Sequence, residues 1–186
     1  MIKPTHLLKP SAGECDLGSA VGGGVRRIVV ALFVLGISSV TLAKANELHA
    51  GEQAFAREEY VRAAAIFIHK AERGDAVAQT YLGSMYSSGR GVPQDYVAAV
   101  QWLRRASDQG YPAAQFLLGL MFDKGHGVKQ DFVEAEILLD LATAHAEPRV
   151  REYWTRIRDA VAGKLSQDEL AHAQKAAVEW RPIQDR

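Results

Sequence analysis

The strongest constraint on the fold is an internal repeat. Residues 78–110 match residues 114–146 at a constant offset of 36 residues. A fixed interval of roughly 20–50 residues indicates stacked structural units that share one continuous core. The identical pairs include Ala78/Ala114, Leu82/Leu118, Gly83/Gly119, Met85/Met121, Gly89/Gly125, Gly91/Gly127 and Asp95/Asp131.

The repeat contains a Gly-x-Gly, which raises the question of a phosphate-binding loop. Such a loop follows a strand and opens a helix, whereas here it follows residues 78–86, whose apolar positions have helical spacing. We expect Gly89 to end one helix in a left-handed conformation, Gly91 to turn the chain and Asp95 to cap the next helix. Each unit is therefore predicted to be a helical hairpin.

A degenerate unit precedes these two. Ala63 lies 36 residues before Ala99, but Gly51 precedes Ala63 by 12 residues while Gly83 precedes Ala99 by 16. The first hairpin is therefore predicted to have a loop that is shorter by four residues.

Residues 78–110 resemble a Sel-one-like repeat, a relative of the tetratricopeptide repeat. They carry Ala-x3-Leu-Gly-x-Met-Tyr, then Gly-x-Gly-Val-x-x-Asp, then Ala-x2-Trp and a closing Ala-x3-Gly. In residues 114–146, Leu138 replaces the tryptophan and Ala146 replaces the last glycine. The resemblance covers roughly residues 46–180. It implies an all-α fold, a right-handed α-solenoid of antiparallel helical hairpins with a C-terminal capping helix pair.

The end of the sequence predicts that cap. Ser166 followed by Glu169 is a capping box ahead of a helix that runs to about Trp180. A polar-faced terminal helix seals the last apolar face of a solenoid. The predicted organisation is an unstructured extension at 1–24, a signal peptide or membrane anchor at 25–45, a degenerate first repeat at 46–76, Sel-one-like repeats at 77–112 and 113–148, and capping helices at 149–181.

Residues 25–45 have the features of a secretory signal peptide. Two arginines precede an apolar run from Ile28 to Leu42, and residues 43–45 provide an A-x-A cleavage site. The run has 15 residues, whereas a membrane span needs about 20. We expect cleavage after Ala45 and a periplasmic or secreted protein. The alternative is that the run is retained and anchors the chain in the inner membrane.

The composition of the mature chain gives no sign of nucleic-acid binding or catalysis. Without residues 1–45 it has 17 basic and 20 acidic residues, a formal charge of −3, and it has lost Cys15, the sole cysteine. This slightly acidic charge balance does not provide the basic surface that nucleic-acid binding requires. No His pair has the i, i+4 spacing of metal ligands. We expect no enzyme, metal or cofactor, and we expect His126, which replaces Arg90 of the preceding repeat, to be a solvated loop residue.

The family resemblance places the functional surface on the concave face, which the first helix of each hairpin lines. Apolar and small residues near the middle of this set, with charges at the rim, suit an extended peptide or a partner helix. Phe116 and Leu120 are the predicted anchors, and the alternative for Phe116 is packing between neighbouring repeats. The predicted groove residues are Thr80, Ser84, Ser87, Phe116, Leu120, Asp123 and Lys124.

The resemblance implies a protein that binds a protein or peptide partner, as an adaptor or regulator in the bacterial envelope. One alternative is a scaffold that residues 28–42 hold in the membrane. A second alternative is a cell-wall-directed or β-lactam hydrolase. Cysteine-rich relatives described with β-lactam activity have disulfide-stapled repeats, and a mature chain without cysteine cannot form such bridges.

Overall fold

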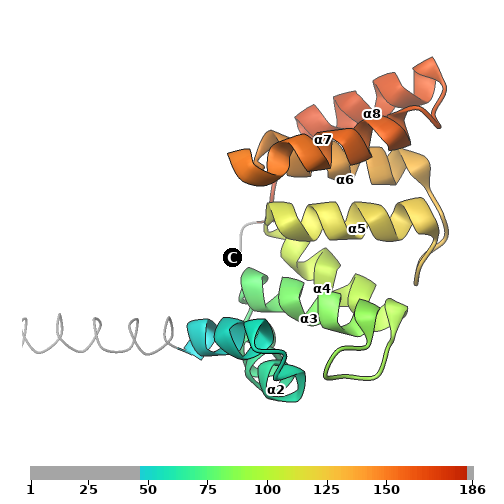
Figure 1. The fold of residues 1–186 in the computed structure, drawn as a ribbon. Helices are drawn as coiled ribbons and strands as arrows, with labels where there is room; N and C mark the ends of the chain where they lie inside the picture. The colour runs from blue at the N-terminus through green and yellow to red at the C-terminus, as the bar shows by residue number, and fades with distance from the viewer. Residues whose placement is uncertain (1–46, 184–186) are drawn as a thin grey trace, which may run out of the picture. The chain divides into compact units, whose positions relative to one another are not determined.

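The computed structural model describes residues 47–183, which form helices joined by loops and contain no strand (Figure 1). The predicted extension and signal peptide lie outside the described residues. Residues 47–56 are helical, and they are followed by α2 (Tyr60–Ala71), α3 (Ala76–Ser88), α4 (Tyr96–Asp108), α5 (Pro112–Lys124), α6 (Phe132–Ala144), α7 (Pro148–Ala162) and α8 (Gln167–Glu179).

Successive helices pair into hairpins, and the hairpins stack in chain order. Residues 47–56 pack on α2, α3 packs on α4 and α5 packs on α6, while α2–α3 and α4–α5 contacts join one hairpin to the next. In Figure 1, α3 and α5 lie side by side on one face of the array. This arrangement is an α-solenoid of helical hairpins, as the repeat predicts. The first interhelical loop has three residues, 57–59, against seven in 89–95, which confirms the predicted difference of four.

The loop chemistry confirms the predicted roles of the repeated glycine and aspartate. Gly89 ends α3 in the left-handed region with a φ of 71°. The Asp95 carboxylate accepts the backbone N–H groups of Val97 and Ala98 at 2.9 and 3.0 Å, which caps α4. The next loop repeats this arrangement with Gly125 and Asp131.

The second glycine of each loop has a further role that the sequence did not suggest. A Cβ atom at Gly91 would lie 2.3 Å from the carbonyl oxygen of Tyr60, at the start of the preceding hairpin's second helix. Gly127 is in the same position against the carbonyl oxygen of Tyr96. The loop therefore fits against the previous unit only because a side chain is absent at this point, and this contact couples one unit to the next.

Each hairpin is closed by a glycine in its first helix that faces a large residue in its second helix. The facing residue recurs every 36 residues and is no more than 1% exposed in all three hairpins. A Cβ atom on the glycine would lie 2.6–3.0 Å from it, so the two backbones approach more closely than an alanine would allow. The pairs are Gly51 with Phe67, Gly83 with Leu103, and Gly119 with Leu139.

A buried glutamine in the first helix is treated differently in the two full repeats. The side-chain oxygen of Gln79 accepts a hydrogen bond from Gln109 at 2.9 Å. The equivalent oxygen of Gln115 is buried and has no hydrogen-bond partner. The position equivalent to Gln109 is His145, whose ring contacts the carbonyl of Leu141 at 3.1 Å. His145 therefore reproduces the contact that Gln109 makes with the carbonyl of Arg105 in its own helix. It does not reproduce the hydrogen bond that Gln109 donates to Gln79 in the neighbouring helix.

The cap is built differently from the hairpins. Both α7 and α8 pack mainly against α6, and they have little contact with each other. Trp154 of α7 stacks on Phe116 with a centroid separation of 4.7 Å. The predicted capping box between Ser166 and Glu169 is present at the start of α8. After α8 the chain turns back, and the N–H of Ile183 donates to the carbonyl of the last α4 residue at 2.7 Å.

Gly83→Ala tests the close approach of the helices. Alanine favours a helix interior by about 1 kcal/mol over glycine. Its Cβ would lie 2.6 Å from the branch carbon of Leu103, and such overpacking costs about 1–3 kcal/mol. We expect a net loss of stability in urea unfolding, larger than that of Gly119→Ala, where the nearest side-chain atom is 3.0 Å away. An increase in stability for Gly83→Ala would contradict this account.

His145→Gln tests the missing hydrogen bond. The new amide should donate to the orphaned oxygen of Gln115, as Gln109 does to Gln79 in the preceding repeat. A satisfied bond in place of an unsatisfied buried acceptor should stabilise the protein by about 1 kcal/mol. Thermal unfolding measures the change. The reverse substitution, Gln109→His, should destabilise by a similar amount, and no effect of either substitution would show that the bond has no energetic weight.

Candidate protein-binding surfaces

Four of the seven predicted groove residues meet around a small cleft between the two full repeats. Ser84 and Ser87 come from α3, while Leu120 and Lys124 come from α5. The cleft has a volume of about 180 Å³. The other lining residues are Tyr96, Leu103, Leu117, Met121 and His126.

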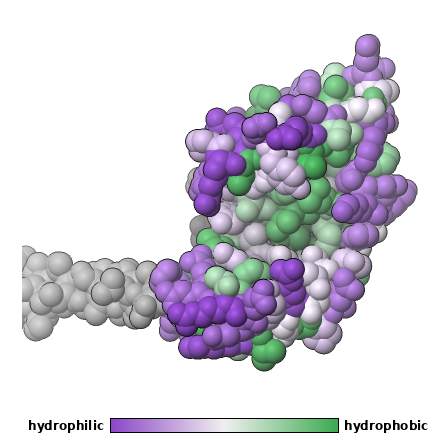
Figure 2. Space-filling view, viewed as in Figure 1, coloured by the Kyte–Doolittle hydropathy of each residue, from purple (hydrophilic) through white to green (hydrophobic). Residues whose placement is uncertain are grey.

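The cleft combines an apolar floor with a polar rim. Leu117 and Leu120 are half-buried on α5, and the two serines with Lys124 surround them. Figure 2 shows apolar surface at the level of α5, with more polar surface above and below it. An apolar centre with a few placed polar groups is the usual character of a recognition site.

The three remaining groove residues are engaged within the fold. Thr80 is 8% exposed, and its hydroxyl donates to the carbonyl of Ala76 in its own helix at 2.7 Å. Phe116 is 6% exposed and lies under Trp154, so it packs between units and is not offered to a ligand. Asp123 forms an ion pair with Lys164, which lies just after α7. These contacts correct the predicted groove: α5 presents Leu117 and Leu120, and not Phe116.

His126 also differs from its prediction as a solvated loop residue. Its ring stacks on Tyr96 with a centroid separation of 4.5 Å and an interplanar angle of 25°. One repeat earlier, the Arg90 guanidinium lies 5.5 Å from the ring centroid of Tyr60. Both members of each pair recur at the offset of 36 residues, and this shared offset is the sequence signal that could have revealed the contact.

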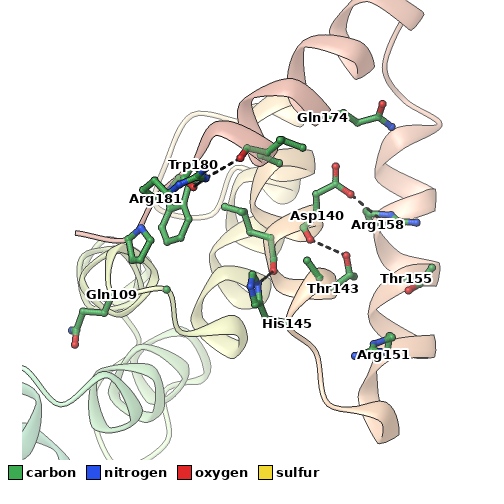
Figure 3. A pocket seen from close by; sticks show the side chains of 16 residues that line it. Gln109, Asp140, Thr143, His145, Arg151, Thr155, Arg158, Gln174, Trp180 and Arg181 are labelled. Atoms are coloured by element: carbon green, nitrogen blue, oxygen red, sulfur yellow. Dashed lines mark hydrogen bonds and ion pairs between the residues drawn. The ribbon is translucent and has the colours of Figure 1, made fainter. Parts of the chain in front are cut away.

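A larger cleft, of about 850 Å³, lies over α6 between α7 and α8 (Figure 3). Asp140 and His145 belong to α6 and its end, Arg151 and Arg158 belong to α7, and Trp180 belongs to the tail after α8. The sequence analysis did not identify this cleft. The i, i+4, i+7 spacing of Arg151, Thr155 and Arg158 could have indicated that these polar side chains share one helix face. No sequence pattern indicated that the tail after α8 would fold back to this face.

A buried carboxyl group lies one helical turn from the wall of this cleft. Glu136 is 1% exposed, and one of its carboxyl oxygens is buried without a hydrogen-bond partner. Burial, together with the charge of nearby Asp140, raises the pKa of Glu136 to about 7, although Arg158 opposes the shift. Arg158 lies 3.5 Å from Asp140. Glu136 is therefore held largely protonated in mildly acidic solution.

Across residues 47–183 no group of three or more His, Cys, Asp or Glu side chains is arranged to hold a metal ion. Within the same residues, no helix is both long and apolar enough to cross a bilayer.

Glu136→Gln tests the buried carboxyl group. The folded protein holds a proton on Glu136 up to a pH of about 7, whereas the unfolded chain releases it near the ordinary value of 4.5. The stability of the wild type should therefore fall relative to the variant as the pH rises from about 4.5 to about 7. The total should be roughly 3 kcal/mol, because one pKa unit corresponds to about 1.4 kcal/mol. Urea unfolding across this range measures the difference.

Two further variants complete that test. Glu136→Leu removes the same titrating group and should give a difference of the same sign and pH dependence. Glu152→Gln removes an exposed α7 carboxylate paired with Arg156, and it should change stability by less than about 1 kcal/mol. A pH-independent difference between Glu136→Gln and the wild type would contradict the assignment.

Comparison with known proteins identifies the repeats. The Sel1 repeat family model matches residues 76–111 and 112–145. A protective antigen of uropathogenic Escherichia coli, which has an SLR fold, is 30% identical over 70% of this chain with a TM-score of 0.65. A Sel1 repeat protein from Oxalobacter formigenes is 36% identical over 48% of this chain with a TM-score of 0.47. No curated protein matches the chain.

This chain spans 28% of the length of the Escherichia coli protein and 26% of the length of the Oxalobacter formigenes protein. The matched residues contain both full hairpins, α3 with α4 and α5 with α6. With two Sel1 repeats in series and a helical-hairpin solenoid like that of an SLR-fold neighbour, the chain is a Sel1-like helical repeat protein.

Proposed function

We propose that this chain is an exported adaptor or regulator of the bacterial envelope that binds a protein segment in the cleft between α3 and α5. Sel1 repeat proteins generally mediate protein–protein interactions and are typically non-enzymatic scaffolds, which supports this proposal. The observation that carries the proposal is the apolar floor of Leu117 and Leu120 inside a polar rim.

The size of the cleft favours a protein segment over a small molecule. Its volume of about 180 Å³ is below the roughly 300–1,000 Å³ of pockets that hold drug-sized ligands. A cleft of this size suits one or two apolar side chains of a longer partner, which anchor an extended peptide or a helix. Leu120, which lines the cleft, is the proposed anchor.

Export rests on the apolar run and A-x-A site of residues 25–45, which lie outside the described residues. Cleavage after Ala45 would leave a mature protein that begins at Asn46. N-terminal sequencing of protein from the cell envelope therefore separates the exported form from the anchored scaffold, which would retain residues 28–42 in the membrane fraction.

A hydrolase is the less favoured alternative. A catalytic serine needs a base within hydrogen-bond reach. The hydroxyl of Ser87 instead donates to the carbonyl of Ser84 in its own helix, at 3.3 Å. The two repeats share the capping role of Asp95 and Asp131, which engages these carboxylates with backbone N–H groups.

A photo-crosslinking side chain at Leu120, in living cells, tests the proposal. We expect a discrete protein adduct, because Leu120 lines the cleft. The matched control is the same probe at Gln101, an exposed position on α4, which should give none. Leu117 provides a second probe in the cleft. Absence of an adduct from both Leu117 and Leu120, or equal adducts from Gln101, would refute binding in this cleft.

A further inference from the structure

The cleft between α7 and α8 is a second candidate binding site, on different helices from the groove. It exists because these two helices diverge over α6 and do not close into a hairpin. The tail after α8 lies along one end of the cleft, where Trp180 packs against Gly110. A Cβ atom added to Gly110 would lie 3.5 Å from the indole ring. At about 850 Å³ the cleft is large enough for several residues of a peptide.

The charged groups of the cleft are predominantly cationic. Arg151 and Arg158 face it from α7, Arg181 faces it from the tail, and Asp140 is the one acidic lining residue among those that the structure describes. Arg158 is engaged by Asp140 at 3.5 Å and by Asp159 at 2.7 Å. The cleft therefore has a local excess of positive charge within a mature sequence whose formal charge is −3.

Arg151 and Arg181 hold this excess charge because backbone carbonyls, not carboxylates, position them. Arg151 donates to the carbonyl of Ala146 at 2.7 Å. Arg181 donates to the carbonyls of Trp180 and Val178 at 2.6 and 2.9 Å. Among residues 47–183, neither guanidinium has a carboxylate within 4.0 Å. Each guanidinium has five N–H donors, so most of them remain for a ligand.

Other arginines of the same helix behave differently. Arg149 pairs with Glu147 at 3.0 Å, and Arg156 pairs with Glu152 at 2.9 Å. Neither of these arginines lines the cleft. Among the four arginines of α7, Arg151 is thus the one without a carboxylate partner in residues 47–183.

Much of the cleft lining is apolar, although Thr143, His145 and Gln174 also line it. Leu141 and Ala144 line it from α6, while Ala177 and Val178 line it from α8. Val178 is 76% exposed, so its side chain is available to a partner. Figure 3 shows Arg151 on the α7 side of the cleft and Trp180 with Arg181 on the opposite side.

We propose that this cleft binds an acidic segment of a partner protein. Two side-chain carboxylates of the segment accept hydrogen bonds from Arg151 and Arg181, since guanidinium groups bind carboxylates in bidentate fashion. An apolar side chain between those carboxylates packs on Val178 and Trp180. A membrane surface or a nucleic acid would require a broad basic face, whereas here the neighbouring arginines are neutralised by glutamates.

The test uses an end-blocked, fluorescein-labelled peptide of alternating glutamate and leucine, and the full mature protein. Fluorescence anisotropy should detect binding, and a peptide with glutamine for glutamate should bind at least roughly tenfold more weakly, because it loses the charge-assisted hydrogen bonds to the two guanidinium groups. The double variant Arg151→Gln/Arg181→Gln should lose a similar factor. The matched control is Arg149→Gln/Arg156→Gln, which removes the same charge outside the cleft and should retain affinity within about twofold.

Three results would overturn the inference. These are equal binding of the glutamate and glutamine peptides, equal losses in the two double variants, and no binding of the glutamate peptide at millimolar concentration. Binding of the same arginine pair to anionic lipid vesicles, without binding to the peptide, would also overturn it. Leu120→Arg, which blocks the groove between α3 and α5, should leave peptide binding unchanged, so failure at one site is distinguishable from failure at the other.

Discussion

The structure depends on the contact between a glycine in the first helix of each hairpin and a large apolar residue in the second. In the middle hairpin, Gly83 allows Leu103 to approach so closely that even a methyl group at residue 83 would overlap with it. Both residues are buried. Because this contact sets the separation of the two helices, it also sets where the outer faces of the hairpin lie. Gly91, the second glycine of the loop, then packs against the backbone of Tyr60 in the preceding hairpin. This contact fixes how two successive hairpins stack.

The regular hairpin pattern ends with the repeat formed by α5 and α6, and this repeat contains two buried polar side-chain atoms without a hydrogen-bond partner. Gln115 lacks the hydrogen bond that Gln79 makes, and Glu136 has an unpartnered carboxyl oxygen. Burying such groups is unfavourable, so they reduce the stability of the α6 region. The two cap helices lie on α6 without closing on each other. The same departure from the hairpin pattern leaves the cleft open, with Arg151 and Arg181 beside it, which have no carboxylate partner among residues 47–183.

The candidate groove was only partly predictable from the sequence. Ser84, Ser87, Leu120 and Lys124 meet around one cleft because the repeat places equivalent helix faces side by side. Phe116 occupies the position equivalent to Thr80, but α7 presents Trp154 to it, and the two rings stack. Position on a repeated helix defines which face a residue occupies. It does not define whether a residue from the following unit covers it.

The sequence by itself determined the helical hairpins, their order, the length of their loops and the residues that cap them. These features depend on local interactions: the φ preference of glycine, the capping bond of Asp95 and the spacing of small and large residues along a helix. Only the tertiary structure decided which helix faces remain accessible, where the C-terminal tail returns and which arginines have no carboxylate partner within the described part of the chain. Those properties depend on contacts between residues far apart in the chain, such as Ile183 with Asp108, and a local pattern does not encode the partner that a side chain meets across the fold.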